Sequence, residues 1–151
     1  MANTQSMCTS FKGELLTGTH NFGTGVVRAS TAADTFKAAL YLATATINAS
    51  TTAYTTTGEV SGTGYTAGGV TVTFGTAPST SGTTAFVTPS ASITYSAVTL
   101  STAFDCVLIY NSSQSDKAVS VHTFGSQTVT AGTFTLTMPV NDASTGLIRL
   151  A

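Results

Sequence analysis

The chain has 151 residues, enough for one domain with its own hydrophobic core. Apolar residues make up 42% of it, which argues against an intrinsically disordered chain. Only 7% of the residues are Asp, Glu, Lys or Arg, compared with about 25% in an average soluble domain, and the net charge is −1. Five basic residues cannot form the cationic track that phosphate binding requires, so no nucleic-acid partner is expected.

The sequence also carries no sign of membrane insertion or secretion. No apolar run approaches the ~20 residues of a membrane span, so no membrane partner is expected. The first residues lack a basic region followed by an apolar core, so no signal peptide is expected. Cys8 and Cys106 match no metal-ligand spacing, and in a protein made in a cytoplasm they are expected to be buried free thiols.

The scarcity of charged residues bears on whether the protein associates with other subunits. A protein near zero net charge tends to associate, and the cores of protein interfaces are depleted in charged residues. The composition therefore favours a chain whose surface is partly covered in an assembly. The alternative is a merely neutral β-domain rich in Thr.

A short helix is predicted over residues 6–17. Three apolar residues recur on one face of it at intervals of four: Met7, Phe11 and Leu15. Thr4 or Ser6 is expected to cap its start, and Gly18 fits the left-handed position just beyond its end.

The rest of the chain is predicted to be strands separated by turns. Strand patterns occur in eight segments: 35–42, 70–74, 84–88, 92–100, 104–110, 118–124, 134–138 and 147–150. Polar or glycine-bearing turns are expected at 79–82, 111–116, 131–132 and 141–144, and a long loop at 43–57. Residues 35–42 alternate as a half-buried strand, whereas 104–110 are nearly all apolar and are expected in the centre of a sheet.

These segments predict an all-β fold, an antiparallel β-sandwich or jelly roll with a short N-terminal helix. Residues 1–25 are expected to form an N-terminal arm that includes the helix. Residues 26–151 are expected to form a single β-sandwich domain.

No catalytic, metal-binding or cofactor-binding residues are predicted. Residues 62–67 match the pattern G-x-G-x-x-A, but a strand is expected after them, where dinucleotide binding needs a helix. The two histidines, His20 and His122, have no acid nearby in sequence with which to form a triad. Asn48 and Asn111 begin N-x-S/T patterns, and Asn111 is expected to start a turn rather than to carry a glycan.

Glu59 is one of the few charges and precedes the glycine-rich segment 62–69. One interpretation is a solvated acid in a loop. The other is a carboxylate that accepts backbone N–H bonds from the glycine-rich turn and pins its shape. The sequence leaves both open.

Several segments, in order along the chain, resemble small structural proteins of tailed bacteriophages. The longest is residues 53–69, which read AYTTTGEVSGTGYTAGG. The others are 6–16, 36–41, 108–111 with 117–119, and 146–150. The resemblance implies a virion protein made in the host bacterial cytoplasm, with a capsid decoration (cement) protein as the most specific role and the major capsid protein as its partner.

Two other functions stay open at this stage. A tail, neck or fibre-associated virion protein would use the same uncharged β surface. A carbohydrate-binding β module is also compatible with the five tyrosines, although the chain has no Trp.

A decoration protein would contact its partners through apolar and aromatic side chains. The residues predicted for this contact are Met7, Phe11, Leu15, Tyr54 and Tyr65. The alternative for the first three is that the helix covers the chain's own sandwich. Because exposed sheet edges are hazardous in a monomer, a homo-dimer or homo-trimer is also predicted.

Overall fold

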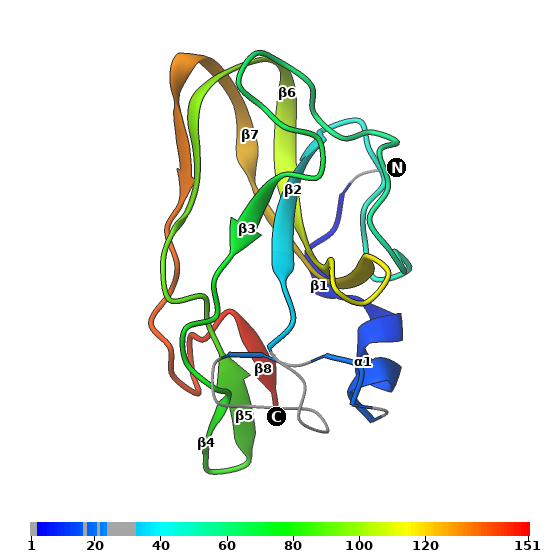
Figure 1. Ribbon diagram of the computed structural model, residues 1–151, viewed down its shortest axis with the longest axis vertical. Coiled ribbons are helices and arrows are strands. Elements are labelled where there is room, and N and C mark those ends of the chain that lie inside the picture. The colour runs from blue at the N-terminus through cyan, green and yellow to red at the C-terminus, as the bar shows by residue number, and fades with distance from the viewer. Residues whose placement is uncertain (1–2, 17, 21, 24–32) are drawn as a thin grey trace.

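The computed structural model describes residues 3–16, 18–20, 22–23 and 33–151 (Figure 1). Its secondary-structure elements are, in order, β1 (Ser6–Met7), α1 (Thr9–Leu16), β2 (Phe36–Leu42), β3 (Val70–Val72), β4 (Ser79–Ser81), β5 (Thr84–Val87), β6 (Ile93–Asn111), β7 (Lys117–Leu136) and β8 (Ile148–Leu150).

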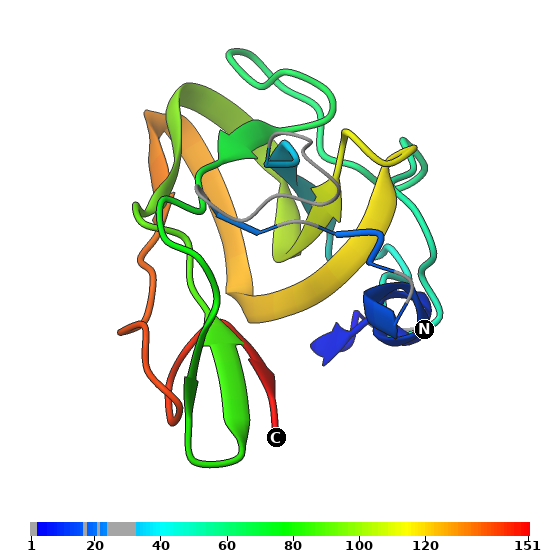
Figure 2. The ribbon, with the colours of Figure 1, turned by 60° about the horizontal axis from the view of Figure 1, so that its bottom comes forward.

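The strands form two antiparallel sheets, which confirms the predicted all-β sandwich class. The larger sheet has the order β1-β7-β6-β2-β3, and the smaller has the order β4-β5-β8. With the lower end turned forward, the small sheet lies beside the strongly curved large sheet (Figure 2). No helix among the described residues is long and apolar enough to span a membrane.

A long hairpin of β6 and β7 is the framework of the large sheet. The predicted strands 92–100 and 104–110 are one strand, and so are 118–124 and 134–138. The turn predicted at 131–132 is wrong: Ala131, with φ of 45°, lies inside β7. The register between the strands shifts there, so the residue is absorbed as a bulge and pairing continues beyond it.

The β2 strand is more buried than its alternation predicted. Residues 38–41 are all buried, including Ala39 and Tyr41 on the face expected to be solvated. The reason is that the segment around Glu59 crosses this strand: the Val60 N–H donates to the Leu40 carbonyl (3.0 Å), and Glu59 pairs with Tyr41 as a β-bridge. The second face of β2 is therefore covered.

The N-terminal helix exists but begins later than predicted. Because Ser6 and Met7 pair with β7, α1 starts only at Thr9, so Thr4 and Ser6 do not cap it. Gly18 has φ of 65° and donates its N–H to the Leu15 carbonyl (3.2 Å), as predicted for the end of a helix. The expected domain boundary, between residues 25 and 26, lies outside the described residues.

The core fills the space beneath α1 and between the sheets with aromatic rings. Phe22 stacks on Phe36 with ring centroids 4.5 Å apart, and Phe74 meets both edge-on. Cys8 and Cys106 are fully buried thiols outside any disulfide, as predicted, and burial next to Asp105 raises the pKa of Cys106 to about 12.

Two predicted turns and the predicted loop can be located. Residues 79–81 form β4 rather than a turn, and Gly82, with φ of 58°, lies in the tight hairpin that follows. Asn111 does start a turn, because its buried side-chain oxygen accepts the Ser113 N–H (3.1 Å). Residues 43–57 form the predicted long loop, bound to the N-terminal segment by bonds such as Thr9 N–H to the Ala49 carbonyl (2.9 Å).

Candidate functional site

Two polar features stand out in the described part of the chain: a carboxylate surrounded by tyrosines, and a groove between the two sheets. The first centres on Glu59, which is partly buried. Its Oε1 accepts the Gly68 N–H (2.7 Å) and the Tyr65 hydroxyl (2.8 Å), and its Oε2 accepts the Tyr54 hydroxyl (2.6 Å). Of the two interpretations from the sequence, the carboxylate that holds the glycine-rich turn is the one observed.

The glycine-rich segment lies against the neighbouring strands so closely that side chains cannot fit. A Cβ atom on Gly62 would lie 2.1 Å from the Thr99 carbonyl oxygen, and one on Gly64 would lie 2.2 Å from that of Ala97. Thr63 forms a β-bridge with Thr99. The segment therefore covers part of the edge of β6 before Phe104, which β2 leaves unpaired. The strand predicted after this segment is present as β3, in the place where a dinucleotide-binding motif has a helix.

All five tyrosines of the chain belong to this region. Two pairs of rings are stacked: Tyr54 on Tyr110, with centroids 4.8 Å apart, and Tyr65 on Tyr95, at 5.9 Å. The remaining hydroxyls donate to backbone carbonyls, from Tyr41 to Thr55 (2.6 Å), from Tyr95 to Ala38 (2.8 Å) and from Tyr110 to Gly68 (2.8 Å). The network ties β2 and β6 to the loop that covers them.

The residues predicted to contact a partner are distributed over two places. Tyr54 and Tyr65 are partly buried within the network around Glu59. Phe11 is 1% exposed and packs edge-on against Phe22, inside the chain's own core. Met7 and Leu15 are partly buried at the margin of that core. The structure does not bring these five residues onto one surface.

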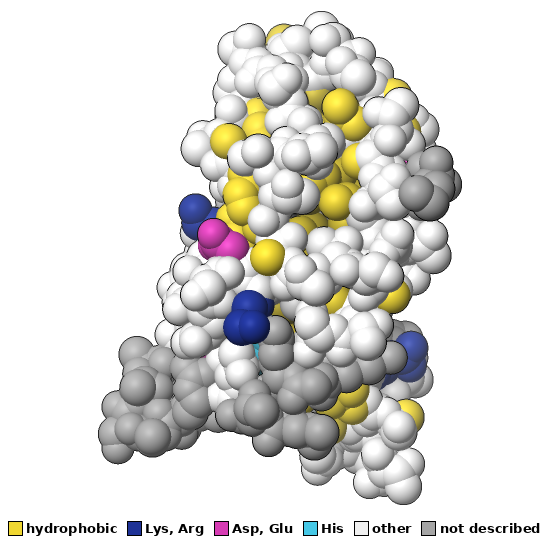
Figure 3. All heavy atoms as spheres, turned by 90° about the vertical axis from the view of Figure 1, so that its right-hand side faces the viewer, with side chains coloured by type: hydrophobic (Ala, Val, Ile, Leu, Met, Phe, Trp, Pro, Cys, Tyr) yellow, Lys and Arg dark blue, Asp and Glu magenta, His cyan; other side chains and the backbone are white. Residues whose placement is uncertain are grey.

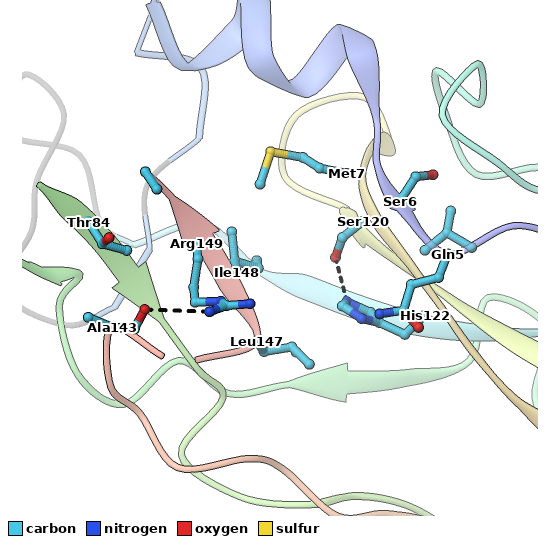
Figure 4. A pocket seen from close by; sticks show the side chains of 12 residues that line it. Gln5, Ser6, Met7, Thr84, Ser120, His122, Ala143, Leu147, Ile148 and Arg149 are labelled. Carbon is cyan, nitrogen blue, oxygen red and sulfur yellow. Dashed lines mark hydrogen bonds between the residues drawn. The ribbon is translucent and has the colours of Figure 1, made fainter. Parts of the chain in front are cut away.

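The second feature is a groove of about 480 Å³ between the two sheets (Figure 4). One wall is β1 with residues 120–122 of β7, and the other is β8 with Thr84 and Ala143. His122 and Arg149 face the opening from opposite walls (Figure 4). Arg149 is exposed, and its Nη1 donates to the backbone carbonyl of Ser144.

His122 lies next to Ser120, with Nε2 2.9 Å from the serine Oγ. Burial lowers the pKa of His122 to about 4, so it is neutral at pH 7 and can act as a hydrogen-bond acceptor or donor. The residues that line the groove include no Asp or Glu to complete a triad with this pair. The described residues also contain no group of three metal-binding side chains. His122 and Arg149 offer polar groups to a molecule that enters the groove.

Sequence reasoning missed the groove. In the sequence, His122 is only an isolated histidine, Ser120 has no motif around it, and Arg149 lies in the segment 146–150 without an assigned role. The residues that line the groove are up to 146 positions apart in sequence, from Gln5 to Ala151, so no spacing pattern could have joined them.

We predict that Glu59→Gln destabilises the fold by about 1–3 kcal/mol, because the amide nitrogen would face a hydroxyl or N–H donor and leave it unpaired. Urea unfolding followed by circular dichroism measures the loss. Asp116→Asn is the matched control, since it removes the same charge from an exposed residue whose left-handed φ of 56° suits Asn. Equal stability of the two variants would show that the network does not depend on the carboxylate.

We also predict a loss of stability above about pH 10. Burial raises the pKa of all five tyrosines above the usual value of 10, to about 12 for Tyr110, whereas in the unfolded chain they ionise near 10. Above pH 10 the unfolded state therefore binds fewer protons than the folded state, and stability falls as the pH rises. Absorbance at 295 nm should show little tyrosinate until the circular dichroism signal is lost, and then all five in one step. Tyrosinate formed gradually from pH 10 in a folded chain would contradict this.

Comparison with known proteins does not assign the chain to a family. No protein-family description, no curated protein and no solved structure matches it. The resemblance to structural proteins of tailed phages therefore stays a prediction from the sequence.

Proposed function

We propose that this protein is a structural subunit that works by packing against other protein subunits. In its most specific form, the proposal is a capsid decoration protein of a tailed bacteriophage, which binds the major capsid protein on the virion surface and stabilises the head. A protein that binds only the assembled state stabilises that state by mass action and needs no chemistry of its own.

The observation that carries the proposal is the distribution of charge. Residues 60–104 and 118–141 contain no Asp, Glu, Lys or Arg. These two stretches form β3, β4, β5 and most of β6 and β7. In Figure 3, the upper third of the face shown has patches of hydrophobic atoms among polar ones and no charged side chain, and the charged side chains that are visible lie near mid-height and below. Such a surface has the composition of an interface core rather than of a solvated exterior.

The edge of β7 supports a contact with a second copy of the chain. Beyond the two residues paired with β1, β7 pairs only with β6 among the described strands. Residues 127–136 thus have one free edge, with exposed Thr side chains and no Lys or Pro to discourage pairing. We propose that this edge is covered in a homo-dimer or homo-trimer.

A carbohydrate-binding function is less well supported by the same geometry. A sugar-binding platform needs an accessible aromatic face, but Tyr54 and Tyr65 each stack on another tyrosine and direct their hydroxyls at Glu59. The observations on charge and on the strand edge favour protein partners instead.

We predict that Thr128→Lys shifts the oligomer towards the monomer, because a lysine on the edge strand would bring like charges together in a symmetric contact. Sedimentation velocity at micromolar concentrations measures the change. Thr56→Lys adds the same charge on an exposed loop residue away from this edge and should leave the oligomer intact. A wild-type chain that is monomeric at these concentrations would exclude the homo-oligomer.

We predict that the protein is abundant in particles of the phage that encodes it. Quantitative mass spectrometry of purified virions should give a ratio to the major capsid protein near one, or a simple fraction of one, because a decoration protein follows the capsid lattice. A ratio of a few per cent would indicate a tail or neck protein instead. Absence from the particle would rule out a virion role.

A further inference from the structure

The groove between the sheets lies where each sheet ends. The large sheet ends in β1 on this side, and the small sheet ends in β8, since each has only one described neighbour in its sheet. Both strands line the same groove, on opposite walls (Figure 4). Two free strand edges thus face one opening.

The register of β1 shows which backbone groups face away from β7. The Cys8 N–H donates to the Val119 carbonyl (3.1 Å), and Met7 lies opposite Ser120. Residues of an antiparallel ladder alternate between hydrogen-bonded and non-hydrogen-bonded pairs, so Met7 is in a non-hydrogen-bonded pair. Its N–H and C=O groups therefore point outward from the sheet edge and can bond to an added strand.

The groove has the charge and polarity to select what enters it. Arg149 is the one cationic side chain among its lining residues, and none of them has an acidic side chain. Within the described residues only Nη1 of Arg149 is engaged, on the carbonyls of Ser144 and Ala143. The other guanidinium N–H groups can donate to a carboxylate, which matches their fork geometry.

The strands on the two walls of the groove are short, since β1 has two residues and β8 has three. An added segment would therefore pair over only a few residues on each wall.

We propose that the groove binds an extended segment of a partner protein as an added β-strand, with an Asp or Glu of that segment on Arg149. The segment would bond to the backbone at the free edges of β1 and β8 and so join the two sheets. Strand addition of this kind gains affinity from main-chain bonds and specificity from side-chain pockets. The inference rests on the proposed function only in taking the partner to be another structural subunit.

The first test is selection from a random library of seven-residue synthetic peptides on the purified full chain. Peptides that bind should be enriched in Asp or Glu and depleted in Pro at their central positions. Hydrogen exchange of the complex should show new protection at residues 5–7 and 148–150. A library that yields no binder, binders without acidic residues, or protection confined to other segments would each overturn the proposal.

Variants test separately the two groups proposed to bind the segment, the Arg149 guanidinium and the outward N–H of Met7. Dissociation constants are measured by fluorescence anisotropy on a selected peptide. Arg149→Gln should weaken binding about tenfold or more, as should the change of the peptide's acid to its amide. Lys37→Gln, which removes a cation outside the groove, should not weaken peptide binding. Met7→Pro removes the outward N–H without breaking a bond to β7 and should also weaken binding at least tenfold, whereas Met7→Leu, which keeps the N–H, should not.

Other outcomes assign the groove differently. Circular dichroism checks that each variant is folded, and Arg149→Lys, which keeps the charge but not the fork, should bind with intermediate affinity. Unchanged affinity in both Arg149→Gln and Met7→Pro would reject the groove as the binding site. If either variant instead dissolves a wild-type oligomer, the occupant is a second copy of this chain and not a partner. Peptide binding by a protein absent from virions would leave this inference standing and remove the phage role.

Discussion

The pairing of β6 with β7 is the interaction on which the rest of the structure depends. β6 is central in the large sheet, with β7 on one side and β2 on the other, and its residues 106–111 are all buried. β7 in turn carries β1, which positions the start of α1 and one wall of the groove. A strand buried on both faces gains the most from the removal of apolar surface from water. The long hairpin therefore acts as the common support of the other elements.

Because charged residues are scarce, the single carboxylate of Glu59 matters more to the fold than one charged group usually does. Glu59 is the last charged residue before a stretch of 45 without Asp, Glu, Lys or Arg, residues 60–104. Removed in part from water, the carboxylate needs donors, and Tyr54, Tyr65 and the Gly68 N–H supply them. The same bonds hold the glycine-rich segment across β6. The segment thus covers part of the edge of β6 that β2 does not reach, whereas the edge of β7 has no such cover among the described residues, and the proposed homo-oligomer follows from that difference.

Local patterns predicted much of the fold and little of the site. The strand at 84–88 is observed as Thr84–Val87, and the predicted helix and its glycine end are present because both depend on neighbours in sequence. The predicted breaks inside β6 and β7 failed, since pairing along a long partner strand absorbs a residue such as Ala131 as a bulge. Burial of both faces of β2 could not be predicted, because a segment about 20 residues away in sequence supplies the cover.

The sequence by itself determined the all-β class, most of the strand segments and the uncharged character of the surface. These properties follow from residue type and from a period of two, which each short segment carries independently of the others. Only the tertiary structure decided that Glu59 has tyrosine and glycine donors, which strand edges stay free, and that Arg149 faces His122 across a groove. Contacts between residues so distant in sequence depend on how the strands order themselves into sheets, and several orders are compatible with the same local pattern.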